Sequence, residues 1–260
     1  MFLKDKQFLI TGVRDDRSIA YGIAKAMHRE GARLAFTCRD PENLNQIREL
    51  VRQFDSDVVL ACNVKEDDQI KQMAQELKER MGYIDGFVHS MAWAPFKAFI
   101  NGFMYATDRE VYRMAHDVSS YSLLGLAREL VPLMKDRQGS ILAVSYVGSQ
   151  TAVPVYNVMG SAKAALEANV RYLANDLGAY GIRVNTISPG PHATKATTIG
   201  DSIYKVLDHY KKVSPLRRNI TIDEVGNTAA FLCSDLASAI TGQVIYPDGG
   251  YTIADTNGVV

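Results

Sequence analysis

Residues 7–37 read QFLITGVRDDRSIAYGIAKAMHREGARLAFT. Two short apolar runs, 7–11 and 33–37, flank the segment 19–30, where apolar residues recur every three or four positions. That spacing is typical of an amphipathic helix, and the flanking runs are typical of buried strands. Two strands joined through a helix must run parallel, because a hairpin cannot connect them. The stretch therefore predicts a β–α–β unit.

The same alternation continues to the end of the chain. Further strands are expected at 57–61, 84–89, 140–144, 182–187 and 242–246, and further helices at 41–54, 65–80, 107–135, 155–180 and 222–236. Right-handed crossovers place such helices on both faces of one sheet. We therefore predict a single α/β domain over residues 1–260, with a doubly wound parallel sheet of about seven strands. Ligands bind beyond the carboxyl ends of the strands in such sheets.

Composition excludes several classes of protein. The 260 residues carry 29 Lys and Arg against 29 Asp and Glu, whereas nucleic-acid binding needs a basic surplus. A charged N-terminus and the lack of an apolar run of about 18 residues predict no signal peptide, no membrane span and a cytoplasmic location. Three widely spaced cysteines and five scattered histidines predict neither a disulfide scaffold nor a metal site.

The turn after the first strand is a candidate nucleotide site. Residues 11–22 lack the G-x-G-x-x-G pattern. Gly12 can still supply a tight turn, and Ser18 and Ile19 open the next helix with free N–H groups that suit a diphosphate. A plain strand–loop–helix turn is the alternative interpretation.

Residues after the next three strands extend this candidate site. Arg39 would suit the 2′-phosphate of NADP and the adjacent Asp40 weakens that inference, while a solvated charge pair explains both equally well. Asn63, after the third strand, could meet an adenine edge. Residues 89–95, after the fourth, form a small-residue floor followed by a loop, and His89 is interpreted as a strand-end histidine rather than a ligand.

A second group of residues follows the fifth and sixth strands. The fifth strand leads into Tyr146, the next helix is expected to begin near Tyr156, and Lys163 follows seven residues later. Seven helical residues make nearly two turns, so Tyr156 and Lys163 would share one face about 10 Å apart, where they could serve a developing oxyanion and a ribose. A core tyrosine and a surface lysine are the alternative. After the sixth strand, residues 190–213 have weak periodicity and are expected to form a mobile substrate lid.

Together these residues resemble the short-chain dehydrogenase/reductase superfamily, and more closely its bacterial enoyl-acyl-carrier-protein reductases. The Tyr-x6-Lys spacing of Tyr156 and Lys163 is specific, because ordinary carbonyl reductases of the superfamily use Tyr-x3-Lys and Gly160 stands at that position here. Other matching segments are SIAYGIA (18–24), AMHREGA (26–32), HD (116–117), SSYS (119–122), YNVMG (156–160), LEANVRY (166–172) and AFLCSD (230–235).

The resemblance implies a Rossmann-like fold that reduces trans-2-enoyl thioesters on acyl carrier protein with hydride from NAD(P)H. It implies that Tyr156 stabilises the enolate, Lys163 holds the nicotinamide ribose and Tyr146 is a second active-site tyrosine. It places Ala94 beside the substrate, and around the dinucleotide it places Gly12, Ser18, Ile19, Asn63, Val64, Met91, His192, Ala193, Thr194, Lys195 and Ala196. NADH is favoured, and NADPH is possible because of Arg39.

The resemblance also implies a homotetramer, and a docking surface for acyl carrier protein near the lid, with Lys205, Lys211, Lys212, Arg217 and Arg218 as candidates. A solvated basic face is the alternative. Several positions depart from the family pattern, which usually has Asp at Asn63, Gly at Ala92, Ala at Pro189 and Ile-Arg-Thr-Leu at residues 192–195. Two other functions therefore stay open: a carbonyl or alcohol oxidoreductase and a non-catalytic dinucleotide-binding sensor.

Overall fold

A computed structural model describes residues 1–194 and 202–254. Within these residues the strands form one parallel sheet of order β3-β2-β1-β4-β5-β6-β7. Their bounds are β1 Gln7–Ile10, β2 Arg33–Cys38, β3 Val59–Ala61, β4 Gly86–His89, β5 Ser140–Val144, β6 Arg183–Ile187 and β7 Val244–Ile245. The predicted doubly wound sheet is confirmed, although the third and last strands are shorter than expected.

The strand order reverses direction beside β1. Phe8 of β1 pairs with Leu34 of β2 on one side and with Gly86 of β4 on the other. The chain therefore winds outward from β1 in one direction and from β4 in the opposite direction. This switch point opens a crevice at the carboxyl ends of the strands, which is where ligands bind in open α/β sheets.

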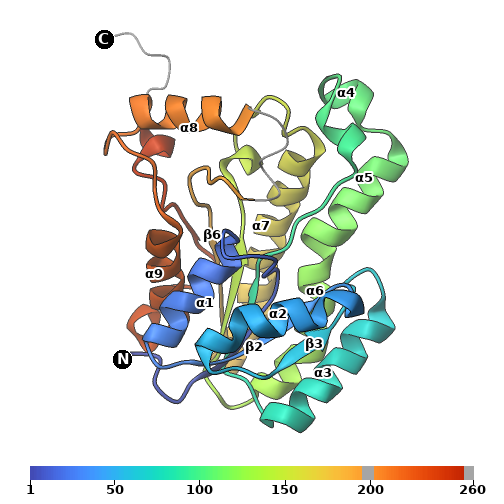
Figure 1. Ribbon diagram of the computed structural model, residues 1–260, viewed down its shortest axis with the longest axis vertical. Helices are drawn as coiled ribbons and strands as arrows, with labels where there is room; N and C mark the ends of the chain where they lie inside the picture. The colour runs from blue at the N-terminus through green and yellow to red at the C-terminus, as the bar shows by residue number, and fades with distance from the viewer. Residues whose placement is uncertain (195–201, 255–260) are drawn as a thin grey trace.

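Helices cover both faces of the sheet (Figure 1). One face carries α1 Ile19–Arg29, α2 Leu44–Val51 and α9 Ile222–Cys233, and the other carries α3 Asp67–Met81, α6 Ser122–Leu130 and α7 Val158–Leu177. Side chains alternate between the two cores along a strand, so Phe8 and Ile10 belong to the first and Leu9 to the second. Burial on both faces explains why the strands read as continuous apolar runs.

The helix predicted over residues 107–135 is interrupted. It consists of α5 Arg109–His116, a π-helical segment Asp117–Tyr121, α6, and a 3₁₀ turn Val131–Met134. Asp108 caps α5, since its Oδ1 accepts a hydrogen bond of 2.8 Å from the Val111 N–H. The π segment turns Ser119 and Ser120 inward, where both are buried. Such segments are frequent at functional sites.

The region predicted to lack periodicity is helical where the structure describes it. Residues Ser202–Val213 form α8, which lies at the same end of the molecule as α4 Gly102–Ala106 (Figure 1). Ile203 and Tyr210, two turns apart, are buried, and the Tyr210 ring stacks on Tyr251 at 3.6 Å. The weak periodicity of this stretch therefore hid a regular helix, and the role of the region as a lid stays a prediction.

Across residues 1–194 and 202–254, no helix combines the length and the apolar character that crossing a bilayer requires.

Candidate active site

The loops that follow β1 and β4 are in direct contact at the switch point. Gly12 has φ +87°, and a Cβ built on it would lie 2.0 Å from the carbonyl oxygen of Ser90. The Thr11 hydroxyl donates to the Val88 carbonyl at 2.8 Å and accepts from the Ser90 N–H at 3.2 Å. Only glycine fits position 12, and its bare backbone keeps this floor open, which suits a diphosphate.

Ser18 is the N-cap residue of α1, but its hydroxyl is used by the loop. Its Oγ accepts hydrogen bonds of 3.1 Å from the N–H groups of both Arg14 and Asp15. The first N–H groups of a helix have no acceptor within the helix. An anion at this turn would therefore meet the backbone of Ile19, while Ser18 holds the loop in shape.

The charged and amide side chains after β2 and β3 are engaged locally. The Arg39 guanidinium contacts both carboxylate oxygens of Asp40 at 2.6–3.0 Å, and this pairing holds the pKa of Asp40 below its usual value. The Asn63 side chain accepts from the Lys65 N–H at 3.3 Å, and Val64 is buried beside it. Each of these polar side chains is therefore bonded to a residue one or two positions away.

The loop after β4 is held by the π-helical segment. The Ser119 hydroxyl accepts from the Trp93 N–H at 3.0 Å and donates to the Trp93 carbonyl at 3.2 Å. Met91 is half-buried and Ala94 is buried on either side of this contact. Sequence reasoning missed this role of Ser119, although serines at 119, 120 and 122 in an otherwise apolar helical pattern were a signal.

Lys163 is buried inside the fold rather than on its surface. It is 4% exposed, and its Nζ donates to the Val144 carbonyl at 2.7 Å and to the Met91 carbonyl at 3.4 Å. Burial lowers its pKa to about 8. An ammonium has three donors, so among the described residues one N–H is left to meet a ligand at the carboxyl ends of β4 and β5.

The two predicted tyrosines lie together, but not as expected from the sequence. Tyr156 precedes α7, which begins at Val158, so the predicted placement of Tyr156 and Lys163 on one helix was wrong. The Tyr156 and Tyr146 rings meet edge to face at 4.9 Å. Burial raises the pKa of both phenols, which favours their protonated, hydrogen-donating form. A hydrogen bond joins Tyr146 to Tyr210 of α8.

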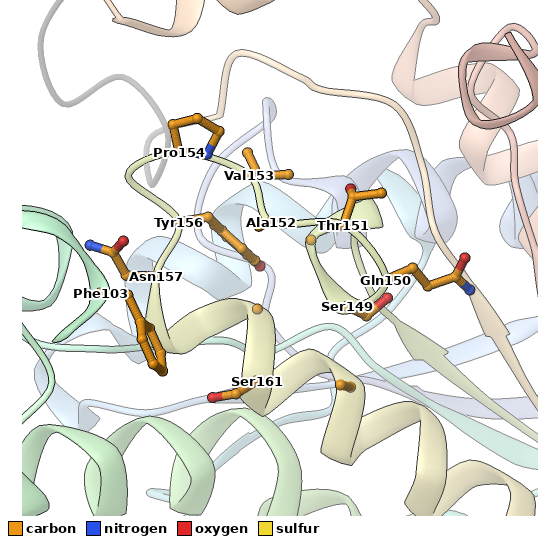
Figure 2. Close-up of a pocket in the computed structure, with 13 residues that line it drawn as sticks. Phe103, Ser149, Gln150, Thr151, Ala152, Val153, Pro154, Tyr156, Asn157 and Ser161 are labelled. Carbon is orange, nitrogen blue, oxygen red and sulfur yellow. The ribbon is translucent and has the colours of Figure 1, made fainter. Parts of the chain in front are cut away.

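A cavity of about 410 Å³ borders Tyr156 on the side of α7 (Figure 2). Its wall combines the segment 148–154 with the start of α7, and Phe103 of α4 contributes one edge. Apolar groups such as Phe103 and Pro154 alternate there with Asn157 and Ser161.

The segment after β6 is described only in part. His192, Ala193 and Thr194 are half-buried, and burial lowers the pKa of His192. Lys195 and Ala196 lie outside the described residues, so their predicted contact with the dinucleotide stays a prediction. No group of three or more metal-binding side chains occurs among the residues that the structure covers.

The fold and this site define a class: a dinucleotide-binding oxidoreductase of the short-chain dehydrogenase/reductase type. The family model described as Enoyl-(Acyl carrier protein) reductase matches residues 12–252, and the chain belongs to this family.

Similar proteins agree with that assignment. The chain is 50% identical over 251 residues to the enoyl-acyl-carrier-protein reductase (NADH) FabI of Aquifex aeolicus, covering 96% of this chain and 93% of that relative. It is 47% identical over 256 residues to the FabI of Escherichia coli, covering 98% and 97%. The crystal structure of the Aquifex aeolicus enzyme matches with a TM-score of 0.94 at 49% identity over the full length of both chains.

Proposed function

We propose that the protein reduces the 2,3 double bond of trans-2-enoyl thioesters on acyl carrier protein with NADH, the last step of the fatty-acid elongation cycle. The observation that carries this proposal is the buried ammonium of Lys163 beside the paired phenols of Tyr146 and Tyr156, at the Tyr-x6-Lys spacing. That spacing argues against the carbonyl-reducing members of the superfamily.

When bound, NADH would supply a hydride to the β-carbon of the substrate, and the resulting enolate would take a proton from solvent at its α-carbon. Tyr156 donates a hydrogen bond to the thioester oxygen as negative charge develops there. Its raised pKa keeps the phenol protonated at neutral pH, so the hydroxyl can donate. One such donor is worth about 3 kcal/mol in the transition state.

Lys163 and Gly12 serve the cofactor rather than the substrate. The Lys163 ammonium is held at the crevice by two carbonyl oxygens, and its remaining N–H would hold a ribose hydroxyl. The bare backbone at Gly12 and the start of α1 would receive the diphosphate. Ala94, buried in the loop after β4, is proposed to border the substrate.

Turnover of an enoyl thioester is the direct test. Loss of NADH absorbance with crotonyl or longer thioesters is expected, with no activity on ketones or alcohols. Activity on ketones alone would instead identify a carbonyl reductase. Tight NADH binding without turnover of any substrate would identify a dinucleotide sensor.

The Arg39–Asp40 pair supports NADH over NADPH. A 2′-phosphate would need the guanidinium of Arg39 as its partner. That group is already paired with the Asp40 carboxylate through three nitrogen–oxygen contacts of 2.6–3.0 Å. Asp40→Asn should lower the KM for NADPH and leave the kcat with NADH unchanged. An unchanged ratio of the two KM values would show that Arg39 does not face the cofactor.

Docking of acyl carrier protein is proposed on the exposed lysines of α8. Lys205, Lys211 and Lys212 are exposed, whereas Arg218 pairs with Glu224 at 2.5 Å and Arg217 donates to the Lys212 carbonyl. The two arginines are therefore poorer candidates than the sequence predicted. Lys205→Glu should raise the KM for a carrier-bound substrate and not for a small thioester analogue, and equal effects on both would contradict docking.

A homotetramer and a cytoplasmic location complete the proposal. Phe231 and Leu236, at the end of α9 and just beyond it, are exposed apolar side chains that an interface would cover, and they are 38% and 66% exposed. Leu236→Lys should shift the mass measured by light scattering to a smaller species. The three cysteines are buried and free, which is compatible with a reducing compartment.

A further inference from the structure

Glu167 is a buried carboxylate that the proposed chemistry does not use. It lies on α7 one helical turn after Lys163, and the two side chains are 5% and 4% exposed. A carboxylate is rarely buried unless it is paired and hydrogen-bonded, because removing it from water is costly. The partners of Glu167 therefore indicate what it is for.

One oxygen of Glu167 holds both ends of the segment that carries Tyr146. Its Oε1 accepts a hydrogen bond from the Ser145 hydroxyl at 2.5 Å and another from the Ser149 hydroxyl at 2.6 Å. Distances this short are typical of hydroxyl groups bonded to a charged carboxylate. Ser145 directly precedes Tyr146, and Ser149 ends the 3₁₀ turn Val147–Ser149 that follows it.

The segment 145–149 also packs against the ring of Tyr156. A Cβ on Gly148 would lie 2.6 Å from the Tyr156 ring, and the Tyr146 ring meets the same ring edge to face at 4.9 Å. Ser149 and Tyr156 both border the cavity shown in Figure 2. A shift of the segment 145–149 would therefore move both phenols.

Glu167 also lies where it can balance the charge of Lys163. Its negative charge opposes the lowering of the Lys163 pKa by burial. Two other ionisable groups interact with these charges: His89 with Lys163, and Tyr246 with Glu167. His89 of β4 is kept neutral by burial, which lowers its pKa to about 3, and the pKa of Tyr246 after β7 is raised by burial and by Glu167. The Lys163 ammonium donates to the Val144 carbonyl and the Glu167 carboxylate accepts from the adjacent Ser145, so the two charged groups contact neighbouring residues of one segment.

We propose that Glu167 is a positioning residue of the active site, which fixes the Tyr146 segment through Ser145 and Ser149 and supplies the counter-charge of the buried Lys163. This inference rests on the proposed reduction of enoyl thioesters, in which Lys163 and the two tyrosines act directly.

Two variants separate the charge of Glu167 from its hydrogen bonds. Glu167→Gln keeps an oxygen that accepts from both serines and removes the charge. We expect the alkaline limb of its kcat/KM profile to move down by about one pH unit, because Lys163 loses its proton earlier without a nearby anion. The Ser145→Ala/Ser149→Ala variant keeps the charge. We expect it to lower kcat about tenfold at an unchanged KM for NADH, with the alkaline limb in place.

The opposite results would overturn the proposal. A wild-type pH profile in Glu167→Gln removes the role of counter-charge, and an unchanged kcat in the double serine variant removes the role in holding Tyr146. Glu167→Asp should restore the alkaline limb and not kcat, since it keeps the charge but shortens the reach to the serines. Full restoration of both by Asp would contradict the positioning role.

A thermal double-mutant cycle tests the charge pair independently of turnover. Glu167→Gln should lower Tm in the native background and less so in a Lys163→Gln background, where the ammonium that needs it is gone. An equal loss of Tm in both backgrounds would show that Glu167 is not the counter-charge of Lys163. If the native enzyme reduces no enoyl thioester, the proposed function fails while this cycle still decides the pairing.

Discussion

The loop after β1 and the chain around Tyr156 both need backbone angles in the left-handed region, and they meet that need differently. The first uses Gly12 at φ +87°, which carries no side chain to strain. The second uses Val155 at φ +70° and Asn157 at φ +48°, on either side of Tyr156. A β-branched residue in this region is an outlier that surrounding structure must hold in place.

This contrast separates two ways of building a site. The loop after β1 presents its backbone to the proposed cofactor, so the residue at position 12 must lack a side chain. The catalytic end presents the buried ammonium of Lys163 and two half-buried phenols, and the segment that carries Tyr146 is held by another side chain, Glu167. Two non-glycine residues with positive φ therefore flank Tyr156, where the proposed chemistry takes place.

The largest expected effect is at the cofactor end. Gly12→Ala should destabilise the fold by about 4 kcal/mol, because the new Cβ overlaps the Ser90 carbonyl and φ is positive. Urea unfolding measures the change. Gly178→Ala is the matched control, since nothing lies within 4 Å of a Cβ there and its φ is −58°. Equal stabilities of the two variants would show that the loops are not in contact.

At the catalytic end the largest effect is on rate. Tyr156→Phe should lower kcat at least about 100-fold, the equivalent of about 3 kcal/mol, with little change in the KM for NADH. Stopped-flow turnover of an enoyl thioester measures it. Tyr172→Phe, on the exposed face of α7 at 74% exposure, should leave kcat unchanged. A similar loss in both variants would point to general damage to α7.

Lys163 links the catalytic end to pH. Its pKa of about 8 in the fold lies below its value in the unfolded chain, so between these values the unfolded state binds more protons and stability rises with pH. The free energy of unfolding of the native protein should therefore rise, relative to that of Lys163→Met, by about 2 kcal/mol from about pH 8 to about pH 10. Activity that needs the charged lysine should fall over the same range. A pH-independent difference in stability would refute the buried ammonium.

The smallest effect tests the strained turn. Val155→Asn should stabilise the protein by about 1 kcal/mol, because Asn tolerates a positive φ and the valine side chain, 57% exposed, loses little packing. Differential scanning calorimetry measures the change in Tm. Val155→Ala should give no such gain, since alanine is strained at the same φ. An equal gain from alanine would mean that the side chain, and not the backbone, is the cause.

Periodicity predicted the sheet and most helices because strands buried on both faces and amphipathic helices have distinct repeats. It failed at residues 117–121, where a π-helical segment changes the phase of the helix, and at Tyr156, where positive φ angles delay the start of α7. The pairing of Glu167 with two serines depends on contacts between residues 18 and 22 positions apart that spacing does not report.

The parallel pairing of β1 with β4 has a consequence for synthesis. Residues 7–10 find their central partner only when residues 86–89 have left the ribosome, and β6 and β7 follow nearly 100 residues or more after that. Non-local pairing of this kind is slow and leaves apolar strands without partners in the meantime. A nascent chain of this protein should therefore depend on chaperones until most of its length has emerged.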